Sequence, residues 1–326
     1  MRLTHLSVLS ASVLVAACGG GGGGGNSFNG AEEPASTFAI TSANATAATS
    51  ASWEAVVASS DFGDLGGGLG LSAAIPGSVA KATQAFKAAG QSTGTGQAVP
   101  FGPIVSPCLP SGAVTISGDV ADLLTLTAGD TFDVLYEQCN EGAGEVIDGA
   151  IAFTVADFSG DLQLGTYLLS MDAIVTNLQI ETATDTITNN GDASVTLDTV
   201  QTPFIETGVS GTSMIVDTNT SSQTLSNFVS SATLDAGMQN LPYTKAASGT
   251  LNTTQLGGVV DYSTPVEFSG EGTNYPAAGS LLVEGANSSA LLTALDDVNV
   301  TIEIDANGDG VIDDTINTTW AALVGS

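Results

Sequence analysis

Apolar and polar residues alternate along most of the chain from about Ala113 to Leu323. Successive side chains of a β-strand point to opposite faces of a sheet, so such a pattern buries one face and leaves the other polar. The stretch DVNVTIEID has an inward set of Val298, Val300, Ile302 and Ile304 and an outward set of Asn299, Thr301 and Glu303. This alternation predicts that the chain folds mainly as β-sheet.

The same pattern recurs in other segments, which are separated by turn-forming residues. The predicted inward residues are Val114, Ile116, Phe132, Val134, Tyr136, Ile151, Phe153, Val155, Val195, Leu197 and Thr199. The strongest hairpin signal is Asn189-Asn190-Gly191. About ten or more such strands predict one all-β domain over residues 111–326, an antiparallel meander in the form of a barrel, a half-barrel or a sandwich.

The region 41–110 is rich in Ala, Ser, Gly and Thr, and two of its segments have helical character. The first, residues 42–60, carries Trp53, Val56 and Val57, which are predicted to dock it against a larger body. The second spans residues 77–90 between two glycine-containing ends. Both helices are too short and too weakly amphipathic to be stable alone. They are expected either to pack against the β domain or to stay partly disordered.

The chain begins with features of an exported protein. An apolar run from Leu6 to Ala17 is too short for a permanent membrane helix and fits a signal peptide over residues 1–17. Val15-Ala16-Ala17-Cys18 resembles the lipobox of bacterial lipoproteins; a plain signal peptide is the alternative. The resemblance implies cleavage before Cys18 and its lipidation. The Gly-rich segment 18–40 then reads as a flexible tether.

The same resemblance bears on the location of the protein in the cell envelope. In bacterial lipoproteins the residue after the lipidated cysteine influences sorting between membranes. Gly19, in place of an aspartate, implies the outer membrane. Both the periplasmic side and the cell surface stay open.

The distribution of charge excludes several classes of function. Arg2 and His5 lie in the predicted signal peptide, so the remaining chain has no arginine and no histidine. Three lysines against 34 carboxylates give it a formal charge of −31. Catalysis by Ser-His-Asp or Cys-His groups is therefore excluded, imidazole-based metal sites are disfavoured, and nucleic acid is not an expected partner. No catalytic residue is predicted.

Cys108 and Cys139 form an even pair in a chain that is predicted to be exported. Such a pair favours a disulfide over a metal site or a catalytic thiol, since both alternatives lack a histidine partner. A disulfide that closes the loop between Cys108 and Cys139 stabilises a fold by about 3–4 kcal/mol on the chain-entropy model.

The stretch DANGDGVID resembles the DxNxDGxxD calcium loops of dockerins, thrombospondin type 3 repeats and EF-hands. The resemblance implies weak Ca²⁺ binding by a ligand set of Asp305, Asn307, Asp309, the Val311 carbonyl and Asp313. The bidentate carboxylate of an EF-hand is missing, because Ile316 occupies its position, and the flanks read as strands. The alternative is an ordinary turn in which Asp and Asn cap their own backbone.

Several segments together resemble a loose group of bacterial lipoproteins without an assigned activity. They are the lipobox with its polyglycine tether, PCLPSG…GDTFDVLYEQC and GSLLVEGANSS…VTIEIDANGDGVIDDTINTTW. The leading hypothesis is a non-enzymatic, outer-membrane-anchored β domain with a structural or interaction role. The runner-up is a carrier of an apolar ligand, such as a lipid or acyl chain, in the curled sheet. Hydrolysis of sugars by a carboxylate pair ranks third, because no two carboxylates are singled out.

Overall fold

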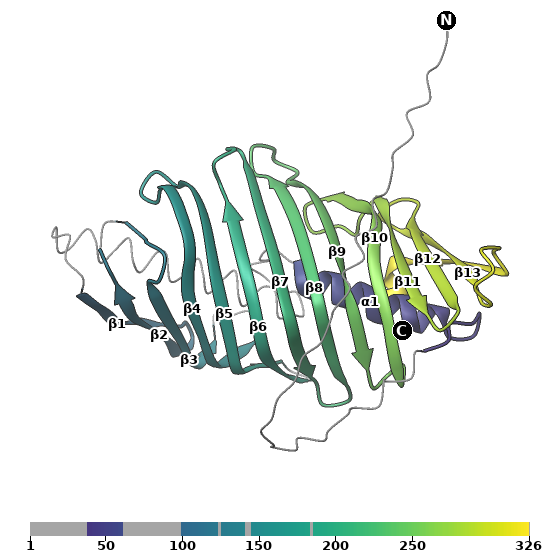
Figure 1. Ribbon diagram of the computed structural model, residues 1–326, viewed down its shortest axis with the longest axis horizontal. Helices are drawn as coiled ribbons and strands as arrows, with labels where there is room; N and C mark the ends of the chain where they lie inside the picture. Colours follow the sequence, from purple (N-terminus) through teal and green to yellow (C-terminus); the bar gives the residue numbers. More distant parts are fainter. Residues whose placement is uncertain (1–37, 61–98, 123–124, 141–144, 183–184, 326) are drawn as a thin grey trace, which may run out of the picture. The chain divides into compact units, whose positions relative to one another are not determined.

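A computed structural model describes residues 38–60, 99–122, 125–140, 145–182 and 185–325 of the chain (Figure 1). All of them belong to one compact unit, Ala35–Ser326. The predicted signal peptide, the lipidation site, most of the tether and the second predicted helix lie outside the described residues.

One antiparallel sheet of fourteen strands dominates this unit, and its strands follow one another in sequence order (Figure 1). The strands are β1 (Val99–Pro107), β2 (Ser111–Val120), β3 (Thr131–Asn140), β4 (Val146–Asp161), β5 (Thr166–Glu181), β6 (Thr186–Asp198), β7 (Phe204–Asp217), β8 (Ser222–Asp235), β9 (Pro242–Thr253), β10 (Gly258–Glu271), β11 (Ala278–Gly285), β12 (Ser288–Ala294), β13 (Asn299–Asp305) and β14 (Asp314–Thr319). The predicted all-β meander is confirmed. Among the described residues the sheet is open, since β1 and β14 are its two edges.

The alternation that predicted the strands matches their burial. In β3, Phe132, Val134 and Tyr136 are buried while the residues between them are exposed. β13 follows the same rule at Val300, Ile302 and Ile304. The sheet begins earlier than residue 111, because β1 pairs with β2 from Val99 onwards.

Two local predictions were wrong. Asn189-Asn190-Gly191 is not a hairpin turn but lies inside β6, where the register shifts against both neighbouring strands and Gly191 has φ +151°. A bulge and a tight turn both use a glycine at positive φ, so the local signal is the same. Val298 was predicted to face inward but is 54% exposed. It precedes β13, in a turn where the backbone N–H groups of Val298 and Asn299 donate hydrogen bonds to the Asp296 carboxylate.

Helix α1 (Ala45–Ser60) confirms the first predicted helix and contacts β7, β8, β9, β11, β12 and β13. Its Trp53 is buried in an aromatic cluster with Phe268 of β10 and Trp320, at ring-centroid distances of 4.8 and 4.6 Å. Trp320 begins the short helix α3 (Trp320–Val324). The Ser50 hydroxyl donates to the Leu323 carbonyl at 2.8 Å and ties the two helices together. Trp320 and Leu323 are both fully buried.

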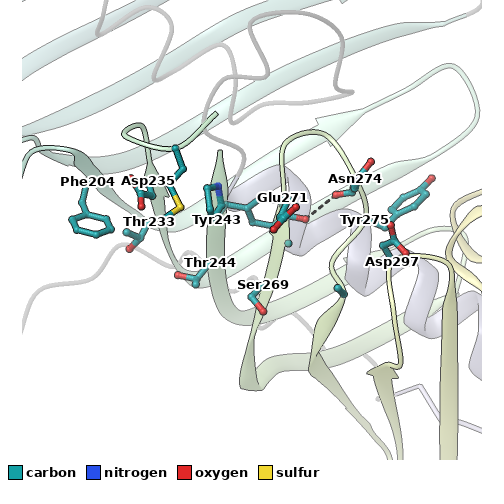
Figure 2. A pocket seen from close by; sticks show the side chains of 14 residues that line it. Phe204, Thr233, Asp235, Tyr243, Thr244, Ser269, Glu271, Asn274, Tyr275 and Asp297 are labelled. Atoms are coloured by element: carbon teal, nitrogen blue, oxygen red, sulfur yellow. Dashed lines mark hydrogen bonds between the residues drawn. The ribbon is translucent and has the colours of Figure 1, made fainter. Parts of the chain in front are cut away.

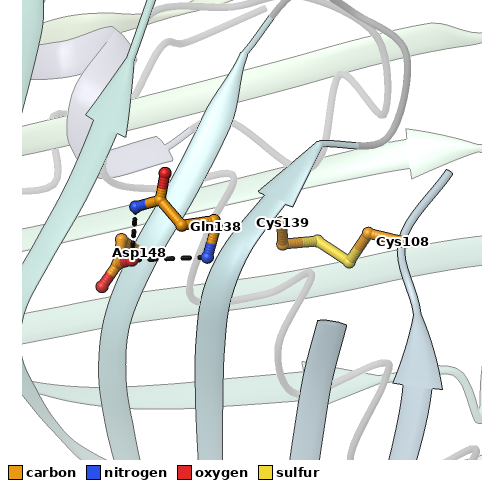
Figure 3. Close-up of a disulfide and its surroundings, with 4 residues drawn as sticks. All are labelled: Cys108, Gln138, Cys139 and Asp148. Atoms are coloured by element: carbon orange, nitrogen blue, oxygen red, sulfur yellow. Dashed lines mark hydrogen bonds between the residues drawn. A yellow bond between two sulfur atoms is a disulfide. The ribbon is translucent and has the colours of Figure 1, made fainter. Parts of the chain in front are cut away.

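The predicted disulfide between Cys108 and Cys139 is present, with Cα atoms 5.3 Å apart (Figure 3). Cys108 lies in the turn between β1 and β2, and Cys139 lies in β3. Next to it, Gln138 has φ +50° and donates hydrogen bonds from its backbone and side chain to Asp148 of β4. The disulfide therefore fixes one end of the first strands of the sheet.

Asn189 is a fully buried polar side chain in β6, beside the bulge. Its neighbours across the sheet are Leu178 of β5 and Val216 of β7. Neither its amide nitrogen nor its amide oxygen has a hydrogen-bond partner in the described structure. Burial of an unpaired amide costs about 1–3 kcal/mol by protein mutational data, so this position lowers the stability of the sheet.

We expect Asn189→Leu to raise the free energy of unfolding by about 1–2 kcal/mol, because the substitution removes a desolvated, unpaired amide. The measurement is the urea midpoint of the full-length protein. The reciprocal substitution, Leu178→Asn, serves as the control and should lower that midpoint. A lower midpoint for Asn189→Leu would show that the amide is paired in solution.

Candidate functional site

A groove of about 530 Å³ lies where β7 and β9 begin and β8 and β10 end (Figure 2). It is the candidate site, because ligand sites are concave and combine apolar walls with a few polar groups. Its lining is Phe204, Thr233, Asp235, Met238, Pro242, Tyr243, Thr244, Ser269, Gly270, Glu271, Asn274, Tyr275, Ala277 and Asp297.

A row of hydroxyl groups crosses three adjacent strands in this groove. Thr233 of β8 is the direct partner of Thr244 of β9, and Thr244 is the partner of Ser269 of β10. Cross-strand partners share one face of a sheet, so the three half-buried hydroxyls lie side by side. Ser269 follows Phe268, which packs on Trp53. By alternation, the row therefore lies on the face opposite α1.

Three aromatic rings line the groove, and Figure 2 places Phe204 and Tyr275 at its opposite ends. Phe204 is 42% exposed and Tyr275 is 37% exposed, which is unusual for aromatic side chains. Tyr275 stacks on the buried Trp320, with centroids 5.7 Å apart and planes at 12°. The Trp320 indole N–H donates to the Pro276 carbonyl at 3.1 Å. The aromatic cluster therefore fixes the position of Tyr275.

Tyr243 of β9 supports the connection between β10 and β11, which contains Asn274 and Tyr275. Its hydroxyl donates to the Asn274 carbonyl at 2.9 Å (Figure 2). The Lys245 ammonium lies 5.3 Å from the Tyr243 ring and 5.7 Å from the Trp53 ring. Lys245 is thereby held near the aromatic cluster and is not among the residues that line the groove.

Asp235, Glu271 and Asp297 give the groove three carboxylates, and none of the described residues that line it is a lysine or arginine. Asp235 accepts the Gly237 N–H at 2.9 Å, which orders the turn after β8. Asp297 is placed by the adjacent Asp296, which accepts hydrogen bonds from the side chain and backbone of Asn299 and from the Val298 N–H. These hydrogen bonds lower the pKa of Asp296 and hold the turn between β12 and β13 together.

Sequence reasoning missed this groove. Its residues come from four strands and three connections, and no short motif joins them. The only local signal is the presence of Phe204, Met238 and Tyr275 in turn-like segments, where large apolar side chains are exposed to solvent.

The predicted calcium loop connects β13 and β14 as a hydrogen-bonded turn. Asp305 accepts the N–H groups of Gly308 and Gly310 at 2.7 and 2.8 Å and that of Asn307 at 3.3 Å. Asn307 and Asp309 accept from residues two positions later, and Asp313 accepts the Ala306 N–H. Gly308 and Gly310 have φ +72° and +81°. This geometry is the self-capped turn that was the alternative to a calcium site.

The carboxylates of this turn are spread along the loop. Within the described ranges, no group of three or more His, Cys, Asp or Glu is arranged to hold a metal ion. The carboxylate of Asp305 is largely buried, and those of Asp309 and Asp313 are exposed. Calcium binding by Asp305, Asn307, Asp309, the Val311 carbonyl and Asp313 stays a prediction.

Two competing effects set the pKa of Asp305. Desolvation raises it, but backbone N–H donors led by those of Gly310 and Gly308 outweigh desolvation and lower the pKa below the ordinary aspartate value. A lowered folded-state pKa means that the carboxylate stabilises the fold above the unfolded-state pKa and loses this effect as pH falls through the folded-state pKa.

No helix in the described ranges is both long enough and apolar enough to cross a membrane. No protein-family model, curated protein or solved structure matches the chain. The groove and the acidic turn are therefore interpreted from their own chemistry.

We expect Asp305→Asn to lower the unfolding midpoint at pH 7, because a neutral amide is a weaker acceptor for three backbone N–H groups. The difference from wild type should shrink as pH falls below about 4, where the wild-type carboxylate also loses its charge. Urea unfolding at a series of pH values measures it. Asp309→Asn, which affects a single acceptor, is the matched control and should have a smaller effect. A difference independent of pH would contradict the role of the charge.

For the calcium prediction, we expect millimolar Ca²⁺ to raise the melting temperature of wild type and to leave that of Asp309→Ala unchanged, because ligand binding to the folded state alone is stabilising. The measurement is a thermal melt with Ca²⁺ and with a chelator, with Mg²⁺ as the control ion. The absence of a shift in wild type, or an equal shift in the variant, would contradict a site in this loop.

Proposed function

We propose that the protein is a lipid-anchored, non-enzymatic component of the bacterial outer membrane with a structural or interaction role. The observation that carries the anchor is Val15-Ala16-Ala17-Cys18 at the end of a short apolar run, followed by glycines. A lipidated Cys18 would hold the chain to the membrane through several acyl chains, each worth about 0.8 kcal/mol per buried methylene. The Gly-rich tether would let the β domain stand away from the lipid surface.

The interaction role is supported by the form of the domain. The large sheet buries the apolar side chains of one face in a core and offers a rigid frame, and its groove presents exposed aromatic rings beside hydroxyl and carboxylate groups. These are the side-chain types of a binding surface. A strongly negative chain is a poor ligand for nucleic acid, which is itself polyanionic.

A non-enzymatic role agrees with the residue types in the groove. The part of its lining that the structure describes has no histidine, cysteine or lysine to act as nucleophile or base near neutral pH. The lining of the groove includes hydroxyl and carboxylate groups beside its aromatic rings, which suits an interaction surface better than a carrier of an apolar chain.

The lipid anchor predicts the outcome of one substitution. We expect Cys18→Ser to move the protein from the membrane fraction to the soluble fraction of the envelope and to abolish incorporation of labelled palmitate. Cell fractionation and metabolic labelling measure the two effects. Cys108→Ser is the control, because it changes another cysteine and should leave the labelling unchanged. Continued labelling of Cys18→Ser would contradict the proposal.

A further inference from the structure

The groove has the dimensions and chemistry of an extended ligand site. Thr233, Thr244 and Ser269 lie on three neighbouring strands, which are about 4.8 Å apart, so their row measures about 10 Å. Phe204 on β7 and Tyr275 after β10 extend the site beyond both ends of the row (Figure 2). A ligand that lies across the strands would meet an aromatic ring at each end and hydroxyls between them.

We propose that this groove binds a neutral oligosaccharide. A sugar ring has an apolar face that stacks on an aromatic ring, and hydroxyls at its edge that both donate and accept hydrogen bonds. Tyr275, held by Trp320, supplies a preorganised stacking surface. The threonine and serine hydroxyls supply donors and acceptors, and Asp235, Glu271 and Asp297 accept from sugar hydroxyls in charge-assisted hydrogen bonds.

Charge selects a neutral glycan over an acidic one. Three carboxylates and no lysine or arginine are among the described residues that line the groove, and the chain has a formal charge of −30. Acidic sugars would therefore be repelled.

Charge alone does not favour a basic peptide. Glu271 and Asp297 are exposed, so salt screens their attraction for a cation. The half-buried hydroxyl row and the two aromatic ends contribute to binding of a sugar chain without such dependence on salt.

The test uses the full-length protein and three neutral probes, cellohexaose, xylohexaose and maltohexaose. Binding is followed by calorimetry and by tryptophan fluorescence, which should change because Tyr275 stacks on Trp320, one of only two tryptophans in the chain. We expect at least one probe to bind, with an affinity that changes little between low and high salt.

Two groove variants and one control test the location. Thr244→Val keeps the shape of the side chain and removes the central hydroxyl, so it should weaken binding about fivefold. Tyr275→Ala removes the stacking ring and should weaken binding about tenfold or more. Thr154→Val changes an exposed threonine of β4, far along the sheet, and should leave the affinity unchanged. Melting temperatures verify that each variant is folded.

Two results would overturn the proposal. One is the absence of binding for all three probes, and the other is binding that Thr244→Val and Tyr275→Ala leave unchanged. Tighter binding of a lysine-rich peptide, abolished by high salt, would instead assign the groove to a cationic partner. The lipid anchor is measured separately by labelling of Cys18, so either idea can fail without the other.

Discussion

The contact of Trp53 with Phe268 and Trp320 is the interaction on which the rest of the domain depends. These rings come from α1, β10 and α3, so one cluster joins the beginning, the middle and the end of the described chain. Buried aromatic side chains contribute large apolar areas, and the two tryptophans of the chain are both used here. Without this cluster, α1 would be a short helix with no stable position.

The same cluster links the core to the groove. Trp320 is buried under Tyr275, and its indole N–H is bonded to the next residue of that loop. On the other side, Tyr243 binds the loop at Asn274. A ring that is exposed for a ligand is thus held by contacts made inside the protein. Rigid presentation lowers the entropy cost of binding, because the side chain is ordered before the ligand arrives.

Sequence patterns predict the parts of this fold that repeat. Alternation identified the strands because burial of one face acts on every second residue, as in β3. The wrong predictions concern positions where the local backbone conformation, and not the apolar pattern, determines the structure. Gly191 adopts a positive φ inside β6, opposite the bulges of β5 and β7, and not in a turn. Val298 is turned outward because Asp296 caps the chain before β13. The groove could not be predicted, because its residues meet only after the four strands β7 to β10 have paired. The acidic loop was recognised, and its hydrogen bonds show why the same residues also make a turn.

Among the described residues the sheet has two edges, β1 and β14, without a further strand partner, and such edges are templates for association with other strands. The first edge, β1, contains Pro100, Pro103 and Pro107. Proline has no N–H to donate, so this strand offers a discontinuous ladder to a neighbouring molecule. At the other edge, β14 is short and leads directly into α3. The composition of the two outermost strands therefore protects the protein against growth of its own sheet by addition of further strands.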